Sequence, residues 1–213
     1  MAKKYAGLIM VLPLLITFST VVLADDFQLI QPKRSDSLSY SDQNIRIRFK
    51  FNKEKLEPWL IAPTGYKKIH FTLENKTNQP ITINWNESSI VLPGGESSKI
   101  MHGGVRFIKA GESMPPTTIP PNSKTSDTVI PAGNVSYSSG MSSGWHISPL
   151  GIFSGSEFGL YLRLKVGEQE RNYNFRFLAR NIDKKSQSDL LGQQIMGGVV
   201  AGLLTGAIVW LVI

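Results

Sequence analysis

Residues 71–149 read FTLENKTNQPITINWNESSIVLPGGESSKIMHGGVRFIKAGESMPPTTIPPNSKTSDTVIPAGNVSYSSGMSSGWHISP. Short apolar runs in this stretch alternate with glycine, proline, asparagine and serine, and none has the 3.6-residue period of an amphipathic helix. The clearest run places Ile81, Ile83 and Trp85 at every second position, with polar residues between them. Because strand side chains point alternately to opposite faces, this pattern is typical of a strand with one buried face. The stretch therefore predicts the centre of an all-β domain.

The same alternation extends toward the N-terminus. Residues 45–51 read IRIRFKF and residues 68–74 read KIHFTLE, and both predict half-buried strands of an antiparallel sheet. The polar face of the first strand is the basic row Arg46, Arg48 and Lys50. We interpret this row as a solvated face, and the alternative is an anion-binding face.

A hairpin is predicted toward the C-terminus. Residues 161–166 and 173–178 both alternate, and a turn over residues 167–171 can bring their apolar faces together. Strands at this spacing, without helices between them, predict an immunoglobulin-like antiparallel β-sandwich over residues 25–180. The chain has no cysteine, so the likeness concerns architecture alone, and disulfides and thiolate chemistry are excluded.

The central stretch also has irregular parts. Residues 81–86 and 89–92 are predicted as two strands of a meander. Residues 97–107 predict a strand with a bulge at Gly103-Gly104. The proline-rich residues 110–123 predict a loop around an edge or an end of the sandwich, because proline cannot donate to a sheet.

The N-terminus has the pattern of a secretory signal peptide over residues 1–24. Lys3 and Lys4 precede a long apolar run, which ends in small residues before an acidic pair. This predicts export and cleavage after Ala24. The alternative is an uncleaved signal anchor, which would also export the residues that follow.

The C-terminus predicts a membrane anchor. After a polar linker, residues 181–194, the 19 residues 195–213 carry no charge. At about 1.5 Å per residue they would span about 28 Å, close to the hydrocarbon thickness of a bilayer, so a transmembrane helix is predicted. Gly198, Gly202 and Gly206 lie four residues apart and form one candidate helix-packing stripe. Alternatively, glycine is simply common in transmembrane helices.

The formal charge of the chain is +7, from 23 basic and 16 acidic residues. Loss of Lys3 and Lys4 with the leader would leave +5, since 7 minus 2 is 5. Acids are interspersed with the bases, which predicts a mixed, solvated surface. The functional alternative is attraction to an anionic membrane.

Few residues in the sequence indicate a catalytic or metal-binding site. His70, His102 and His146 lack metal-ligand spacing, and the serines of residues 136–143, in a region interpreted as a flexible linker, lack a nucleophile elbow. We therefore expect no catalytic residue, no metal and no cofactor. Trp85 and Trp145 either fill the core or stack on a sugar or peptide ligand.

Several short motifs resemble those of a group of uncharacterised bacterial envelope proteins. These motifs are residues 84–88 (NWNES), 100–104 (IMHGG), 119–121 (IPP), 131–135 (PAGNV) and 144–145 (GW). The resemblance covers residues 68–164 and implies an exported small β-sandwich. Members of the group are usually exported or lipid-anchored, whereas this chain has no cysteine to carry a lipid. The resemblance implies no activity and no ligand.

Together these features predict a non-enzymatic interaction module on a bacterial cell membrane. It would have a single C-terminal span, and its main domain would be periplasmic or extracellular. The expected partners are the membrane and either an envelope protein or a second copy of the chain, and nucleic acid is not expected. The alternatives are a structural subunit of an envelope complex, assembled through the glycine stripe, and an envelope hydrolase.

Overall fold

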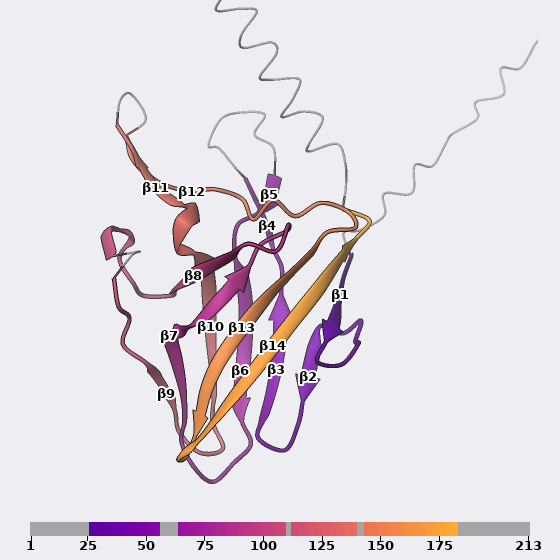
Figure 1. Cartoon of the computed structure of the whole chain (residues 1–213), viewed down its shortest axis with the longest axis vertical. Helices are drawn as coiled ribbons and strands as arrows, with labels where there is room; N and C mark the ends of the chain where they lie inside the picture. Colours follow the sequence, from indigo (N-terminus) through magenta and orange to yellow (C-terminus); the bar gives the residue numbers. More distant parts are fainter. Residues whose placement is uncertain (1–25, 56–63, 110–111, 140–142, 183–213) are drawn as a thin grey trace, which may run out of the picture.

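The computed structural model describes residues 26–55, 64–109, 112–139 and 143–182 (Figure 1). These residues form an all-β fold with antiparallel pairing, which confirms the predicted class. The elements in chain order are β1 (Asp26–Gln31), β2 (Ser39–Ser41), β3 (Ile45–Lys50), β4 (Lys53–Lys55), β5 (Thr64–Tyr66), β6 (Ile69–Asn75), β7 (Ile81–Val91), β8 (Ser97–His102), the 3₁₀ turn η1 (Phe107–Lys109), β9 (Thr117–Ile119), β10 (Lys124–Pro131), the 3₁₀ turn η2 (Ala132–Asn134), β11 (Val135–Ser138), β12 (Gly144–Ile147), β13 (Glu157–Val166) and β14 (Gln169–Arg180).

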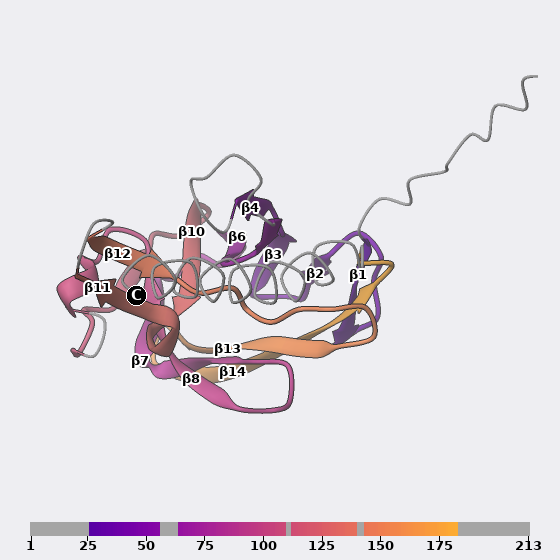
Figure 2. The same ribbon diagram turned by 90° about the horizontal axis from the view of Figure 1, so that it is seen from above.

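The main strands form two layers, which Figure 2 shows from above. The strand order is β1-β14-β13-β7-β8-β10-β6-β3-β2, and β9 also pairs with β7. We call β1, β14, β13, β7 and β9 sheet A, and β10, β6, β3 and β2 sheet B. Strand β8 joins them, because Ser97–Lys99 pair with β7 and Ile100–His102 pair with β10. The sandwich is therefore one sheet folded along β8.

Aromatic rings from the inner faces of both sheets meet in the core. The ring of Phe49 on β3 lies 4.9 Å from that of Phe175 and 4.8 Å from that of Phe177, both on β14. Alternation places these rings inside, since β3 has the burial pattern buried, exposed, buried, exposed. Burying a phenylalanine side chain contributes about 1.5–3 kcal/mol, so these contacts hold the layers together.

The predicted C-terminal hairpin is confirmed as β13 and β14. Leu162 lies opposite Tyr173, as the alternation indicated, and pairing continues to Val166 opposite Gln169. The turn is therefore shorter than the predicted residues 167–171. Gly167 makes this possible with a φ of 58°, and a Cβ there would lie 1.7 Å from Oε1 of Gln79.

Strand β7 corrects the predicted meander, because residues 81–91 form a single strand. Asn84 lies opposite Arg163 and Ser89 opposite Tyr161, so residues 85–88 of β7 bulge against a single residue of β13. The hydroxyl of Ser88 accepts the Arg163 N–H at 3.1 Å. A bulge of this kind shifts the alternation, which is why the sequence resembles two strands.

Three other segments differ from the predictions. β8 ends at His102, and Gly103-Gly104 form a turn after it rather than a bulge within it. The proline-rich segment 110–123 contains β9, which pairs with β7 through Ile119 opposite Ile81. The serine-rich residues 136–143, expected to be a flexible loop, begin with residues 136–138 of β11, which pairs with β12. The sequence also indicates a short strand over residues 134–137, and β11 contains most of it.

The predicted signal peptide, most of the polar linker and the predicted anchor with Gly198, Gly202 and Gly206 lie outside the described residues. Among the residues that are described, no helix is long and apolar enough to cross a membrane.

Candidate functional site

The two candidate tryptophans lie in different environments. Trp85 is 2% exposed and belongs to the core, whereas Trp145 is 41% exposed on β12. The core interpretation therefore holds for Trp85 and is wrong for Trp145. The indole N–H of Trp85 donates to Oγ1 of Thr117 at 2.9 Å, and its ring stacks on His102 with centroids 4.4 Å apart and planes at 10°.

His102 is also held by Asp127. Its Nδ1 lies 3.2 Å from Oδ2 of Asp127, while Oδ1 of Asp127 accepts the Gly103 N–H at 2.9 Å and the Thr128 N–H at 2.6 Å. A Cβ at Gly103 would lie 2.8 Å from that oxygen, which explains why glycine follows His102. The carboxylate therefore fixes the turn that ends β8.

This pair does not form a catalytic triad with the described residues. Nε2 of His102, the atom that would accept a proton from a nucleophile, is buried and has no hydrogen-bond partner among them. The other histidines lie elsewhere: Nδ1 of His70 contacts Oγ1 of Thr128 at 2.8 Å, and Nε2 of His146 contacts the Ser138 hydroxyl at 2.7 Å. Within the described ranges no three potential metal ligands form a group.

The pKa of His70 is lowered from its ordinary value. Burial is the main cause, followed by the positive charge of Lys68, and Lys50 acts in the same direction. A group with a lowered pKa is neutral under conditions in which a free histidine begins to protonate. His70 therefore contributes hydrogen-bonding capacity rather than charge to the surface around it at neutral pH.

A groove of about 360 Å³ lies beside His70 and His102, between sheet B and the segment after β8. Its lining residues are Lys68, His70, Met101, His102, Gly103, Gly104, Val105, Phe107, Thr128, Ile130 and Ile147. An exposed aromatic cluster adjoins it, because Phe107 lies 6.0 Å from Trp145, and Trp145 lies 5.4 Å from Tyr137. Tyr137 is 59% exposed. Large exposed rings of this kind are enriched where proteins meet other surfaces.

The outer face of sheet B is a polar ladder of three cross-strand rows. Strand register places these residues in the rows Ser41, Arg46, Glu74 and Lys124; Ser39, Arg48, Thr72 and Ser126; and Lys50, His70 and Thr128. Its charged side chains are four cations and Glu74, a net charge of +3 (4 minus 1) with His70 neutral. Arg46 pairs with Glu74 at 2.9 Å, whereas Arg48, Lys50 and Lys124 have no ion-pair partner in the part of the chain that the structure describes. We call these eleven residues the basic ladder.

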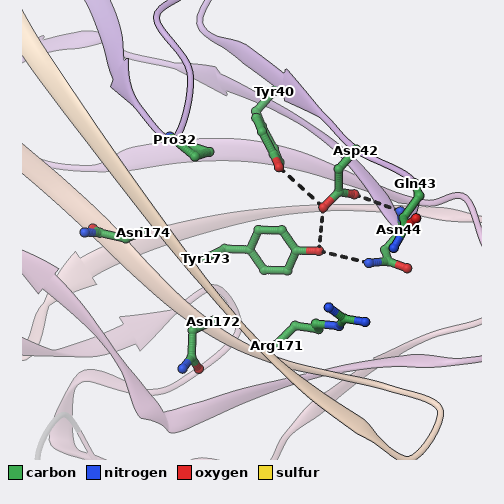
Figure 3. Close-up of a pocket in the computed structure, with 9 residues that line it drawn as sticks. All are labelled: Pro32, Tyr40, Asp42, Gln43, Asn44, Arg171, Asn172, Tyr173 and Asn174. Carbon is green, nitrogen blue, oxygen red and sulfur yellow. Dashed lines mark hydrogen bonds between the residues drawn. The ribbon is translucent and has the colours of Figure 1, made fainter.

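A second pocket lies at the seam between β2 and β14 (Figure 3). Asp42 organises it: Oδ1 accepts the N–H groups of Asn44 and Ile45, both at 2.8 Å, and Oδ2 accepts the Tyr173 hydroxyl at 2.9 Å. The Tyr40 hydroxyl approaches the same oxygen at 3.4 Å. The carboxylate therefore links the turn before β3 to β14, and its hydrogen-bonding capacity is used within the protein.

The seam pocket has a volume of about 400 Å³ and polar walls, formed by Pro32, Tyr40, Asp42, Gln43, Asn44, Arg171, Asn172, Tyr173 and Asn174. Burial is the main cause that raises the pKa of Tyr173 to about 12. Burial also raises the pKa of Tyr40, with a further contribution from Asp42. Both hydroxyls are thus held protonated as donors, which suits a structural closure of the seam.

Sequence reasoning found part of these surfaces. Arg46, Arg48 and Lys50 were visible as a row, but Lys124 joins them only through the register of β10 with β6. Tyr137 belongs to the short run 134–137, which the sequence indicates as a strand but not as an exposed aromatic site. Asp42 and Asp127 gave none, because their partners are distant in sequence.

No protein-family model and no curated protein matches the chain. Among solved structures, the chain is similar to Northeast Structural Genomics Consortium target SoR45, known from an X-ray structure. The two are 19% identical, the match covers 64% of this chain and 88% of that one, and the TM-score is 0.34, too low to establish a shared fold.

Proposed function

We propose that this chain is a non-enzymatic interaction module of the bacterial cell envelope that binds an anionic partner on the basic ladder. The sandwich would be exported by residues 1–24 and held at the outer side of the cell membrane by residues 195–213. The two packed antiparallel layers support an immunoglobulin-like classification of the domain.

The observation that carries the proposal is the uncompensated charge of the ladder. Arg48 and Lys50 are exposed and point the same way from β3, and hydroxyl groups adjoin them, including Thr72 and Ser126, whose oxygens lie 2.8 Å apart. Clustered cations with few acids raise the local concentration of anions and speed their association. Rigid strands hold these groups in place, as a specific site requires.

The test uses photo-crosslinking in bacterial cells that export the full chain. A photoreactive amino acid at Ser126, within the ladder, should capture a partner, and Arg48→Glu with Lys50→Glu should abolish the capture. The matched control carries the photoreactive group at Asn172, which is exposed on the opposite sheet. Equal capture from both positions, or capture that survives the charge reversal, would rule out the ladder as the binding surface.

A second experiment separates the binding module from the structural subunit. Deletion of residues 195–213 should leave capture at Ser126 intact if the exported domain binds the partner by itself. An assembly subunit should lose its partner, and Gly202→Ile alone should then weaken the association because it fills the helix groove. Leu204→Ile, about 200° around a helix from Gly202, is the matched control.

A further inference from the structure

The three large hydrophobic side chains that are markedly exposed among the described residues are Tyr137, Trp145 and Phe153, at 59%, 41% and 49%. Tyr137 and Trp145 lie on the β11–β12 hairpin, and Phe153 lies in the connection from β12 to β13. In Figure 1 this hairpin and this connection lie at the upper end of the sandwich, where β14 finishes.

Hydrogen bonds confirm the placement of the connection from β12 to β13. The Gly155 N–H donates to the carbonyl of Ala179 at 2.8 Å, and the Ser156 N–H donates to the carbonyl of Phe153 at 3.0 Å. Phe153 is therefore part of a turn that is fastened beside the last residues of β14. The Leu150 N–H donates to the carbonyl of Tyr66 at 2.7 Å, which ties the same connection to β5.

The chain leaves the described domain at this end. Residues 183–194 are twelve residues between Ile182 and the first residue of the proposed anchor, and twelve residues extend to at most about 40 Å. A short tether gives a weak contact a high effective concentration. The end that carries the three rings is thus the part of the domain that residues 195–213 hold nearest to a membrane.

Several lysines lie near this end of the sandwich. β3 ends at Lys50, β4 begins at Lys53, and Lys67 and Lys68 follow β5. Lys68 pairs with Glu54 at 3.1 Å. Tryptophan and tyrosine are enriched at the level of lipid headgroups, where their rings have both apolar and polar neighbours, and nearby lysines are attracted to anionic headgroups.

We propose that this end of the sandwich lies on the membrane that residues 195–213 span, with the rings of Tyr137, Trp145 and Phe153 in the headgroup region. The inference rests on the proposed anchor. It goes beyond that anchor because it assigns a second, peripheral membrane contact, which fixes the orientation of the domain. The strands run away from this end, so the basic ladder would face sideways and stay accessible.

The test uses the full chain reconstituted in vesicles of phosphatidylcholine and phosphatidylglycerol in a three-to-one ratio. Because the chain has no cysteine, Ser136→Cys and Ser154→Cys can each carry a single environment-sensitive fluorophore next to the rings. Glu168→Cys is the control, at the β13–β14 turn on the opposite end, where the glutamate side chain is 94% exposed. Lipids with a nitroxide near the headgroup should quench the first two labels severalfold more than the third.

Replacing the three rings should remove the difference in quenching between the labels. In a chain with Tyr137→Ser, Trp145→Ser and Phe153→Ser, the label at residue 136 or 154 should be quenched no more than the label at residue 168. Such exposed substitutions leave the core intact.

Three outcomes would overturn the proposal. If the chains that keep all three rings float with vesicles but the labels at residues 136, 154 and 168 are quenched equally, the anchor stands and the docking is wrong. A blue-shifted label without lipid quenching would mean that a second copy covers the rings. Failure of the full chain to float with vesicles would contradict both the anchor and the docking.

Discussion

The outer faces of the two sheets both carry cations, but among the described residues acids pair with most of the cations on sheet A and with only one on the basic ladder. On sheet A the ion pairs are Arg163 with Glu87 and Glu170, Lys165 with Glu168, Arg176 with Glu157, and Arg180 with Asp26 and Asp36. On the basic ladder, Arg46 with Glu74 is the one described pair. Both outer faces result from the alternation of side chains along a strand. Strand geometry therefore does not explain why the cations are mostly paired on one face and mostly unpaired on the other. Surface ion pairs contribute little to stability, so leaving the cations of the ladder unpaired should cost the fold little.

The largest loss of stability is expected in the core that the two sheets share. Trp85→Ala removes a side chain that is 2% exposed between the sheets, and it should lower the free energy of unfolding by about 3–5 kcal/mol. Denaturant unfolding of the full chain in detergent would measure the change. Trp145→Ala, the exposed counterpart, should cost about 1 kcal/mol. Equal losses for the two variants would mean that packing around Trp85 does not carry the stability of the domain.

A medium loss of stability is expected at the seam between β2 of sheet B and β14 of sheet A. Tyr173→Phe removes the donor to Asp42 and should cost about 1–2 kcal/mol at neutral pH, while Tyr161→Phe on β13 serves as the control.

The seam effect should depend on pH in the alkaline range. The pKa of Tyr173 is about 12 in the folded protein and about 10 in an unfolded chain. A raised folded pKa means that the stabilisation is complete below about pH 10 and is lost as pH rises toward 12. The difference in stability between the wild-type chain and Tyr173→Phe should therefore shrink between about pH 10 and about pH 12. A constant difference across that range would show that the hydroxyl is not held protonated in the folded state.

A small effect is expected on sheet A. Glu157→Gln removes the partner of Arg176, which lies 2.9 Å away with both side chains partly exposed. The loss should be at most about 1 kcal/mol and should diminish as salt is added. Unfolding at low and high ionic strength tests this, and a loss that does not respond to salt would indicate a packing role instead.

The smallest effect is expected on the basic ladder, with the opposite response to salt. Arg48→Gln with Lys124→Gln should change stability by no more than about 0.5 kcal/mol. Any gain in stability should disappear at high salt, because the two substitutions relieve a repulsion between cations that salt already screens. A large loss would show that these cations hold the fold, and it would remove the contrast between the faces.

The sequence alone determined the class of the fold and the sides of its strands. Period-two alternation over residues 45–50 gave the buried and exposed faces of β3, because side-chain direction in a strand depends only on position along it. The β13–β14 hairpin was also predictable, since its partners are neighbours in the chain. The same local pattern identified three of the four cations of the basic ladder.

Only the tertiary structure decided how these strands meet. The division of β8 between two sheets, the pairing of β9 with β7, and the position of Lys124 beside Glu74 depend on register between distant segments. The hydrogen bond of Asp42 with Tyr173 joins residues 131 positions apart, and no local pattern encodes such a pair. The exposure of Trp145 and the burial of Trp85 likewise depend on what packs against each ring, because both residues have the same intrinsic preference for a partly buried strand.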